Sequence, residues 1–190
     1  AYRIGGGAGN CGDGNNWQCE TVPGQTGTVG LPTSLALYND YPRIAFHDTS
    51  KGLSFAYQDA GGWHLSLPRG GTDAYGSYLS LALDGSGIPH ISYIAGSNTV
   101  WHAWGSTTGG GTWSNEGVPG ATTAWQTSLA FNTVPCILYY EYYSGNLKYT
   151  CKPSAWDPIE LVADAGQVGE YNSLALGLDG EPHIGYVDFL

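Results

Sequence analysis

The feature of the sequence that most constrains the fold is a short segment that occurs four times. It begins with Ser-Leu-Ala, reaches a Pro after a turn, and continues as a second apolar stretch. The four copies are SLALYNDYPRIAF (34–46), SLALDGSGIPHISY (80–93), SLAFNTVPCILY (128–139) and SLALGLDGEPHIGY (173–186). Successive copies start 45 to 48 residues apart, a period that is typical of repeat architectures.

Each repeat continues in the same way beyond this segment. A third alternating stretch follows at 53–57, 100–104 and 147–151, and a Trp then opens a fourth at Trp63, Trp113 and Trp156. Four short strands with turn residues between them describe one blade of a β-propeller. The sequence therefore predicts an all-β fold, a four-bladed β-propeller with blades at about 34–67, 80–118, 128–162, and 173–190 plus 1–22.

The two ends of the chain account for the last blade. The fourth copy ends at Leu190 after two strands, whereas Ala1–Gly5 and the segment at Trp17 resemble the third and fourth strands of a repeat. Trp17 precedes Ser34 by 17 residues, as Trp63 precedes Ser80. We therefore expect residues 1–190 to form a single domain in which the N-terminal strands close the last blade and cover its open edge. The alternative is an eight-bladed ring shared by two chains.

The charge and the apolar content of the chain limit the classes of partner that it can have. Of the 190 residues, 12% are charged, and the formal net charge is −10. An acidic surface repels nucleic acid and anionic lipid, so we expect no nucleic-acid partner. No apolar run approaches 18 residues, so we expect no membrane insertion.

The four cysteines form two close pairs, Cys11 with Cys19 and Cys136 with Cys151, each across a turn. We expect two disulfides, because neither spacing matches a short zinc motif, the competing interpretation. Disulfides place the protein outside the reducing cytosol. The sequence contains no Met and begins with Ala1, which favours a secreted protein whose signal peptide has been removed.

Several positions that recur in every repeat are expected to serve packing. Small Ser and Ala side chains of the first strand leave room for the leucines of a neighbouring blade, and the four Trp residues are expected to pack between outer strands. Glu20 and Glu116, each three residues after a Trp, resemble solvated strand positions.

Two further sets of repeat positions hold mostly polar residues, and each could serve either structure or ligand binding. The residues after the four prolines, Arg43, His90, Cys136 and His183, could form an axial ring that is either hydrogen-bonded between blades or holds a metal or anion through the two His. The carboxylates Asp48, Glu141 and Asp188 recur six residues after Pro, and they suit turn chemistry or a calcium rim. We otherwise expect no cofactor.

Aromatic residues outside the repeat pattern suggest a contact surface. They cluster in one third strand, in loops before the first strands, and in the Tyr-rich hairpin of the third repeat. The candidates are Tyr78, Trp101, Trp104, Trp125, Tyr142, Tyr143 and Tyr171. Such side chains contact sugar rings or protein, although packing between blades would also account for them.

No catalytic motif stands out. The chain lacks the nucleophile elbow, the zinc-protease helix and the P-loop. Residues 106–113 (STTGGGTW) resemble the Asp-box of sialidase-type propellers with Thr108 in place of Asp, but that box is a turn motif. A sialidase also needs an arginine cluster, and the chain has three Arg in total. We expect no enzymatic activity.

All four repeats resemble bacterial extracellular propeller repeats of the form SLALDxxGxPHISYxD…LxYA…W, with residues 80–113 the best match. This resemblance implies a secreted or surface-displayed binding module and carries no catalytic residues. The expected function is that of a non-catalytic subunit that assembles with copies of itself into an extracellular structure. The alternative is a lectin-like module that binds glycans, and the expected partners are accordingly copies of itself or an extracellular protein or glycan.

Overall fold

The computed structural model describes residues 1–4, 6–25, 27–71 and 78–189, so Gly5 and Leu190 of the predicted last blade lie outside it. Within these residues the fold is all-β with antiparallel pairing throughout, and its single helical element is the 3-10 turn η1 (Asp13–Asn15). No helix in the described part is long and apolar enough to cross a membrane.

Twelve strands form three four-stranded sheets, each a meander in chain order. Sheet 1 consists of β3 (Val29–Tyr38), β4 (Tyr41–Asp48), β5 (Gly52–Asp59) and β6 (Gly62–Gly70). Sheet 2 consists of β7 (Ser80–Leu83), β8 (Pro89–Ala95), β9 (Thr99–Trp104) and β10 (Ser114–Gly117). Sheet 3 consists of β11 (Ala124–Phe131), β12 (Pro135–Glu141), β13 (Asn146–Cys151) and β14 (Glu160–Ala163). These are the four strands predicted for each of the first three repeats.

Two further sheets have two strands each. The N-terminal sheet pairs β1 (Tyr2–Arg3) with β2 (Trp17–Gln18), and the C-terminal sheet pairs β15 (Gln167–Leu176) with β16 (Pro182–Phe189). The C-terminal sheet corresponds to the first two strands of the fourth repeat. Its pairing of Ala175 with His183 matches Ala36 with Arg43 in sheet 1.

The turn between the first and second strands shows how the repeat sequence shapes the chain locally. In sheet 2 the carboxylate of Asp84 accepts hydrogen bonds from the backbone N–H groups of Ser86 and Ile88, both at 2.8 Å. Gly87 in this turn has a φ of +80°, and a Cβ there would lie 2.2 Å from the ring of Tyr38 in sheet 1. Glycine is therefore needed both for the turn and for the close approach of the preceding sheet.

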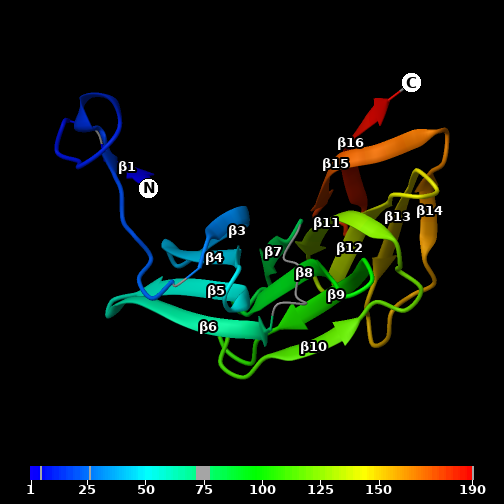
Figure 1. Ribbon diagram of the computed structural model, residues 1–190, viewed down its shortest axis with the longest axis horizontal. Helices are drawn as coiled ribbons and strands as arrows, with labels where there is room; N and C mark the ends of the chain where they lie inside the picture. The colour runs from blue at the N-terminus through cyan, green and yellow to red at the C-terminus, as the bar shows by residue number, and fades with distance from the viewer. Residues whose placement is uncertain (5, 26, 72–77, 190) are drawn as a thin grey trace.

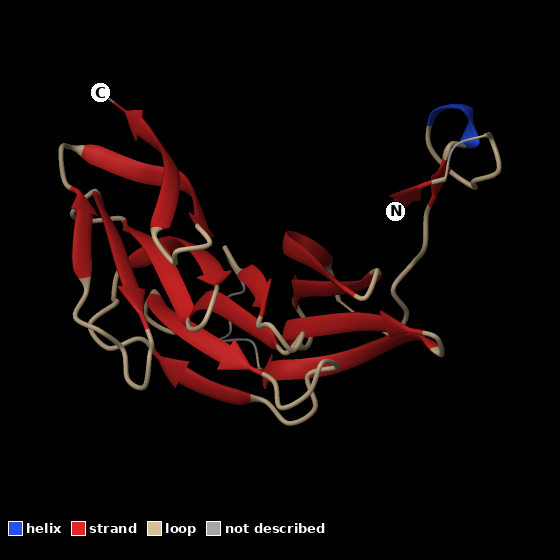
Figure 2. Ribbon diagram, turned by 180° about the vertical axis from the view of Figure 1, so that it is seen from behind, coloured by secondary structure: helices blue, strands red, loops and turns tan. Residues whose placement is uncertain are grey.

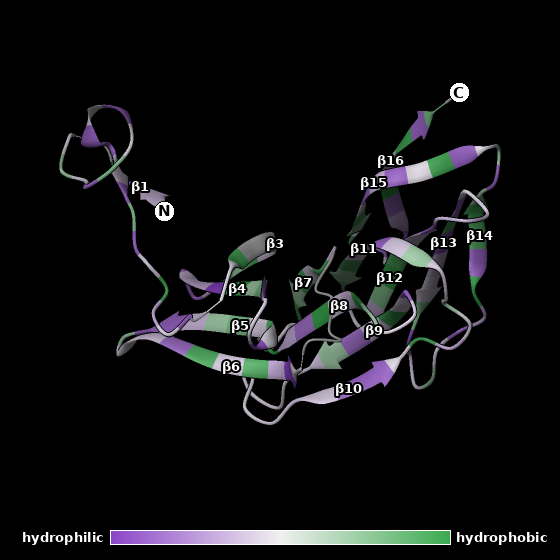
Figure 3. Ribbon diagram, in the orientation of Figure 1, coloured by the Kyte–Doolittle hydropathy of each residue, from purple (hydrophilic) through white to green (hydrophobic). Residues whose placement is uncertain are grey.

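The core lies at the junctions between successive sheets. One buried cluster joins sheets 1 and 2 through residues such as Phe55, Leu81 and Tyr93, and a second joins sheets 2 and 3 through Ile94 and Leu129. A third joins sheet 3 to the C-terminal sheet and includes Cys136, Leu138, Leu147, Tyr149 and Leu174. Hydropathy also differs between the strands of a sheet. In Figure 3 the second strand β12 is mostly apolar, and the outermost strand β10 is polar.

The sheets follow one another along an open arc (Figure 1). The N-terminal sheet lies beyond sheet 1 at one extreme, and the C-terminal sheet lies beyond sheet 3 at the other, as the view from behind confirms (Figure 2). Among the described residues β1 pairs with β2 alone and β16 with β15 alone. In the part of the chain that the structure describes, the pairing by which residues 1–22 were predicted to close the last blade is therefore not seen, and the two ends of the chain lie apart (Figure 1).

Candidate contact surfaces

The same hydrogen bond crosses all three junctions between sheets. The backbone N–H of the Leu that follows the first Ser of one repeat donates to the hydroxyl oxygen of the corresponding Ser in the preceding repeat. The three bonds, each 3.0 Å long, run from Leu81 to Ser34, from Leu129 to Ser80 and from Leu174 to Ser128. The first Ser is thus more than the small packing residue predicted from sequence, because it satisfies a backbone donor at the inner edge of the next sheet.

A second repeated bond links the outer strands. The indole N–H of each repeat Trp donates to the side chain three residues after the Trp of the preceding repeat: Trp113 to Ser66 at 2.6 Å, Trp156 to Glu116 at 3.0 Å, and Trp63 to Glu20 at 3.0 Å. Glu20 is exposed, as predicted, and Glu116 is half-buried, but both also accept a hydrogen bond from a Trp that the prediction did not include. The repeated spacing of three residues after Trp was the signal that could have found these partners.

The two ends of the arc expose the surfaces that the junctions bury. Leu81, Leu129 and Leu174 are 5–8% exposed, whereas their equivalent Leu35 on β3 is 63% exposed and its neighbour Leu37 is 62% exposed. We call this surface the head face. At the other end Val187 and Phe189 of β16 are exposed on the same face of the strand, and we call this surface the tail face.

Four of the predicted contact aromatics gather into one exposed cluster. The indole N–H of Trp125 donates to the hydroxyl of Tyr78 at 2.8 Å, and its ring stacks on Tyr142 with 4.8 Å between centroids. Tyr143 meets Tyr142 edge to face at 5.6 Å. This aromatic cluster presents ring faces to solvent and could contact a sugar or a protein.

The other three predicted contact aromatics lie apart from this cluster. Trp101 stands beneath the guanidinium of Arg69 at 4.1 Å, and Trp104 lies between the ammonium of Lys152 and the ring of His102. Tyr171 is exposed on β15, where its backbone N–H donates to the side-chain oxygen of Gln126. The seven residues therefore do not make one surface.

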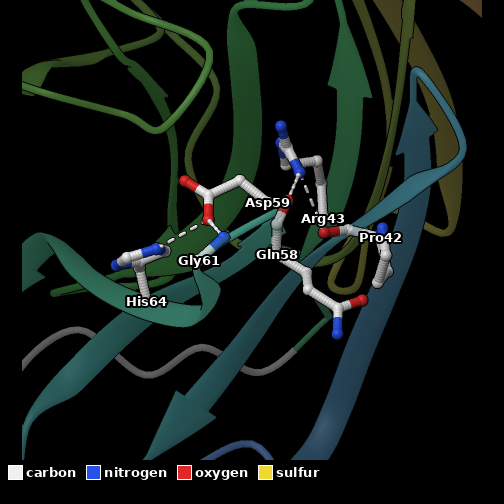
Figure 4. Close-up of polar contacts among 6 residues, drawn as sticks. All are labelled: Pro42, Arg43, Gln58, Asp59, Gly61 and His64. Atoms are coloured by element: carbon white, nitrogen blue, oxygen red, sulfur yellow. Dashed lines mark hydrogen bonds and ion pairs between the residues drawn. The ribbon is translucent and has the colours of Figure 1, made fainter.

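The predicted axial residues do not form a ring; Arg43 and His90 each make contacts at a different junction between sheets. Arg43 is buried at the junction of sheets 1 and 2, where its guanidinium donates to the carbonyl oxygens of Pro42, Gln58 and Thr108. Figure 4 shows the first two bonds and, nearby, the carboxylate of Asp59 between His64 and the N–H of Gly61. Burial lowers the pKa of Arg43, and the bond from His64, with that from Gly61, lowers the pKa of Asp59.

His90 occupies the equivalent position at the next junction. Its Nδ1 lies 3.0 Å from Nε2 of His102, and its ring contacts Phe131 of sheet 3. Burial lowers the pKa of His90 to about 4 and that of His102 to about 3, so both imidazoles are neutral near pH 7. They line a cleft of about 290 Å³ together with Trp104, Pro135, Lys152, Pro153 and Ser154.

The other two predicted axial residues, Cys136 and His183, lie in different environments from Arg43 and His90. Cys136 pairs directly across β12 and β13 with Cys151 and forms a disulfide with it, and Cys11 forms the second disulfide with Cys19. Both predicted disulfides are therefore confirmed. His183 is exposed on β16. The four axial residues contact different neighbours and do not converge on one site.

The predicted calcium rim is divided among three sheets. Asp48 is buried and accepts a hydrogen bond from the N–H of Ser50, as expected for turn chemistry. Glu141 lies 2.8 Å from the ammonium of Lys148; burial acts to raise its pKa, but the bonds from Lys148 and Ser144 outweigh burial and hold the pKa below its ordinary value. Asp188 is exposed on β16. Within the described residues no three His, Cys, Asp or Glu side chains are grouped to hold a metal ion.

No family model matches the chain, and no curated protein is similar to it. Among solved structures, it is similar to the crystal structure of AofleA from Arthrobotrys oligospora, with a TM-score of 0.57 and 10% sequence identity. The match covers 81% of this chain and 48% of that chain, so this chain spans about half the length of AofleA. At this identity the similarity concerns the β fold alone.

Proposed function

We propose that this protein is a secreted, non-catalytic β-propeller subunit that assembles with copies of itself into an extracellular structure. In this proposal each repeat is one propeller blade of the open arc, and residues 1–22 supply the outer strands that the C-terminal sheet lacks. The function requires contacts only and no cofactor.

The observation that carries the proposal is the exposure of the head face and the tail face. Leu35 of the head face occupies the position of the buried Leu81, Leu129 and Leu174, and Val187 of the tail face occupies that of the buried Ile94 and Tyr140. A tail face and a head face are therefore complementary in the way that successive sheets already are. Burying apolar surface contributes about 25 cal/mol per Å², so the two faces favour joining the end of one copy to the beginning of another.

Two further properties agree with an extracellular assembly. The disulfides Cys11–Cys19 and Cys136–Cys151 suit an oxidising compartment. Head-to-tail contact is heterologous, so it generates an open series unless the rotation between copies closes a ring. The net charge of −10 makes copies repel one another, and salt should therefore strengthen assembly by screening that repulsion.

A glycan-binding module is the second candidate, and the aromatic cluster of Tyr78, Trp125, Tyr142 and Tyr143 favours it. An exposed indole stacked on a phenol is a surface on which a sugar ring can lie. Among the described residues the cluster occurs once along four repeats, however, whereas the complementary faces follow from the repeat itself. We therefore place assembly first.

The test is to image the purified protein and measure its sedimentation at about 0.05 and 0.3 M salt, with a glycan array in parallel. We expect polymers that grow with salt and persist in free sugar. The variant Leu35→Asp should abolish them, whereas Leu67→Asp, an exposed leucine on the outer strand β6, should not. Monomers at both salt concentrations, with saturable glycan binding that Trp125→Ala removes, would instead establish the second candidate.

A further inference from the structure

Two strands of the chain end their sheets with an open edge, β16 at the tail and β1 at the head. In sheets 1, 2 and 3 the second strand pairs on both sides, as β8 does with β7 and β9. Its equivalent β16 pairs with β15 alone among the described residues. An edge of unpaired N–H and C=O groups is a template for another strand.

The N-terminal sheet has the register of the strands that would complete this edge. In sheet 1 the repeat Trp63 pairs with Gln58, so that Tyr57 pairs with the next residue, His64. In the N-terminal sheet Trp17 pairs with Arg3, and Tyr2 pairs with Gln18 in the same way. Tyr2 is therefore equivalent to Tyr57, and to Trp104 and Cys151 in the later repeats.

This equivalence identifies the partner of Tyr2 on the second strand. Tyr57 pairs with Arg43, Trp104 with His90, and Cys151 with Cys136. The equivalent residue of β16 is His183, which follows Pro182 as the others follow their prolines. A completed fourth sheet consequently places Tyr2 opposite His183, at the position where sheet 3 carries its disulfide.

The segment after β2 already behaves as the outer strand of a preceding blade. The carboxylate of Glu20 accepts bonds from the indole of Trp63 and the side-chain amide of Gln58, both at 3.0 Å. Glu116 and Ser66 make the same kind of contact with the sheets that follow them. Through Glu20 the segment after β2 is therefore tied to sheet 1, whereas β1 and β2 themselves stand apart from it (Figure 1).

The C-terminal sheet, which would form the other half of this blade, lies at the opposite end of the arc (Figure 1). Joining the two halves within one chain would require the two ends of the arc to approach each other (Figure 1). Each junction is closely packed around buried side chains, and such interfaces resist continuous deformation. A second copy can bring its N-terminal sheet to β16 without any change at these junctions.

We propose that the N-terminal sheet of one copy adds to β16 of a second copy and so completes that copy's fourth blade. The donated β1 pairs with β16, with Tyr2 opposite His183. The head face then covers the tail face, and the N–H of Leu35 donates to the hydroxyl of Ser173 in the other copy. This inference rests on the proposed self-assembly and names the strands that carry it.

The experiment transfers the natural disulfide of sheet 3 to this pair. The four native cysteines are all engaged in two disulfides, so Tyr2→Cys and His183→Cys introduce the sole free thiols. We expect the double variant, after mild oxidation, to show a ladder of covalently linked chains on a non-reducing gel. In the control pair Tyr2→Cys with Ile184→Cys, the adjacent position points to the opposite face of the strand and should not crosslink.

Mixing the single variants decides whether the bond joins two chains. A tagged Tyr2→Cys chain and an untagged His183→Cys chain should form a mixed covalent dimer, and neither variant should do so alone. A bond found only within single chains of the double variant would overturn donation between copies in favour of closure within a chain. Absence of any crosslink would show that the N-terminal sheet does not complete β16.

The outcomes also separate this inference from the proposed function. Polymers seen by imaging without the Tyr2–His183 crosslink would leave self-assembly standing and refute strand donation. Crosslinked species that stop at a dimer would support donation and refute an open polymer.

Discussion

The strands β8 and β16 occupy the same place in their repeats but have opposite environments. Both begin with Pro-His-Ile, and every residue of β8 is buried, whereas most of β16 is exposed. The difference lies in their neighbours. β8 has a strand on each side and a sheet on each face, whereas β16, among the described residues, has a strand on one side only. Burial in this fold is therefore conferred by the next unit, and a strand's own sequence does not guarantee it.

The first strands β7 and β3 show the same difference in burial at the N-terminal end of the arc. Leu81 of β7 is buried against sheet 1, and Leu35 of β3 has the same sequence context but faces solvent. The strands at both ends of the arc therefore have the sequence of a packed junction, but no further sheet of the described chain packs on them. The following predictions compare equivalent residues inside the arc and at its ends.

The largest contrast is expected for the leucines. Leu81→Ala removes a side chain from a packed core and should lower the free energy of unfolding by about 2–5 kcal/mol. Leu35→Ala should change it by no more than about 0.5 kcal/mol when copies are dissociated at low protein concentration and low salt. Urea unfolding of both variants measures this. Equal losses in the dissociated chain would mean that Leu35 is buried by closure within one chain.

The buried histidines at the junction of sheets 2 and 3 should make stability depend on pH. In the unfolded chain their pKa is about 6.5, and in the folded chain burial lowers it to about 4 for His90 and about 3 for His102. The unfolded state therefore binds more protons below pH 6.5. The stabilisation is complete above that pH and is lost as the pH falls towards the folded values, by about 3 kcal/mol for each of the two His at pH 4.

Unfolding curves recorded between pH 7 and pH 4 measure this loss. Replacing His102 with Gln should flatten the dependence. His183→Gln provides the matched control, because His183 has the same repeat position as His90 but is exposed at the tail. A control variant that flattens the curve as strongly would show that His183 is buried in solution.

The two disulfides should differ in their effect on the sheets. Replacing Cys136 and Cys151 with Ala opens a loop within sheet 3 and should lower the free energy of unfolding by about 3 kcal/mol. Cys11 and Cys19 constrain the N-terminal sheet, whose described hydrogen bonds up to Gln18 are internal to it. Replacing that pair should leave the melting temperature of the three larger sheets unchanged, as calorimetry of dissociated protein would show. A lower melting temperature would place the N-terminal sheet against the rest of its own chain.

The smallest effect concerns the serine hydroxyls. Ser80→Ala leaves the N–H of Leu129 without its acceptor and should cost about 1–2 kcal/mol. Ser173→Ala should not change the stability of the dissociated chain, since among the described residues no N–H donates to its hydroxyl. It should instead weaken assembly, which sedimentation at increasing protein concentration would detect. A loss of stability in the dissociated Ser173→Ala chain would contradict the open arc.

Local periodicity was sufficient to predict the strands and their order. The Ser-Leu-Ala segments, the prolines and the repeated Trp residues each fix a strand start or a turn, so three complete four-strand units and one half unit could be placed along the chain. The disulfides were also predictable, because Cys136 and Cys151 lie symmetrically about a hairpin turn.

The arrangement of the units and the contacts between them could not be predicted in this way. A sequence repeat predicts that the units pack on one another. The angle between two units, however, depends on the volumes of the side chains across each junction. For the same reason the sequence did not reveal that His90 would meet His102, or that Trp101 and Trp104 would be covered by Arg69 and Lys152. Their partners come from different strands, and no short spacing connects them.

The serine–leucine bonds have a consequence for how such a chain can change its length. In every junction the earlier unit supplies the acceptor and the later unit supplies the donor. Two head faces brought together would offer two donors and no acceptor, so the contact distinguishes one end from the other. A gene duplication that inserts one whole unit, for example from Ser80 to the residue before Ser128, preserves every donor–acceptor pair. An insertion of half a unit breaks one, which restricts viable length changes to whole repeats.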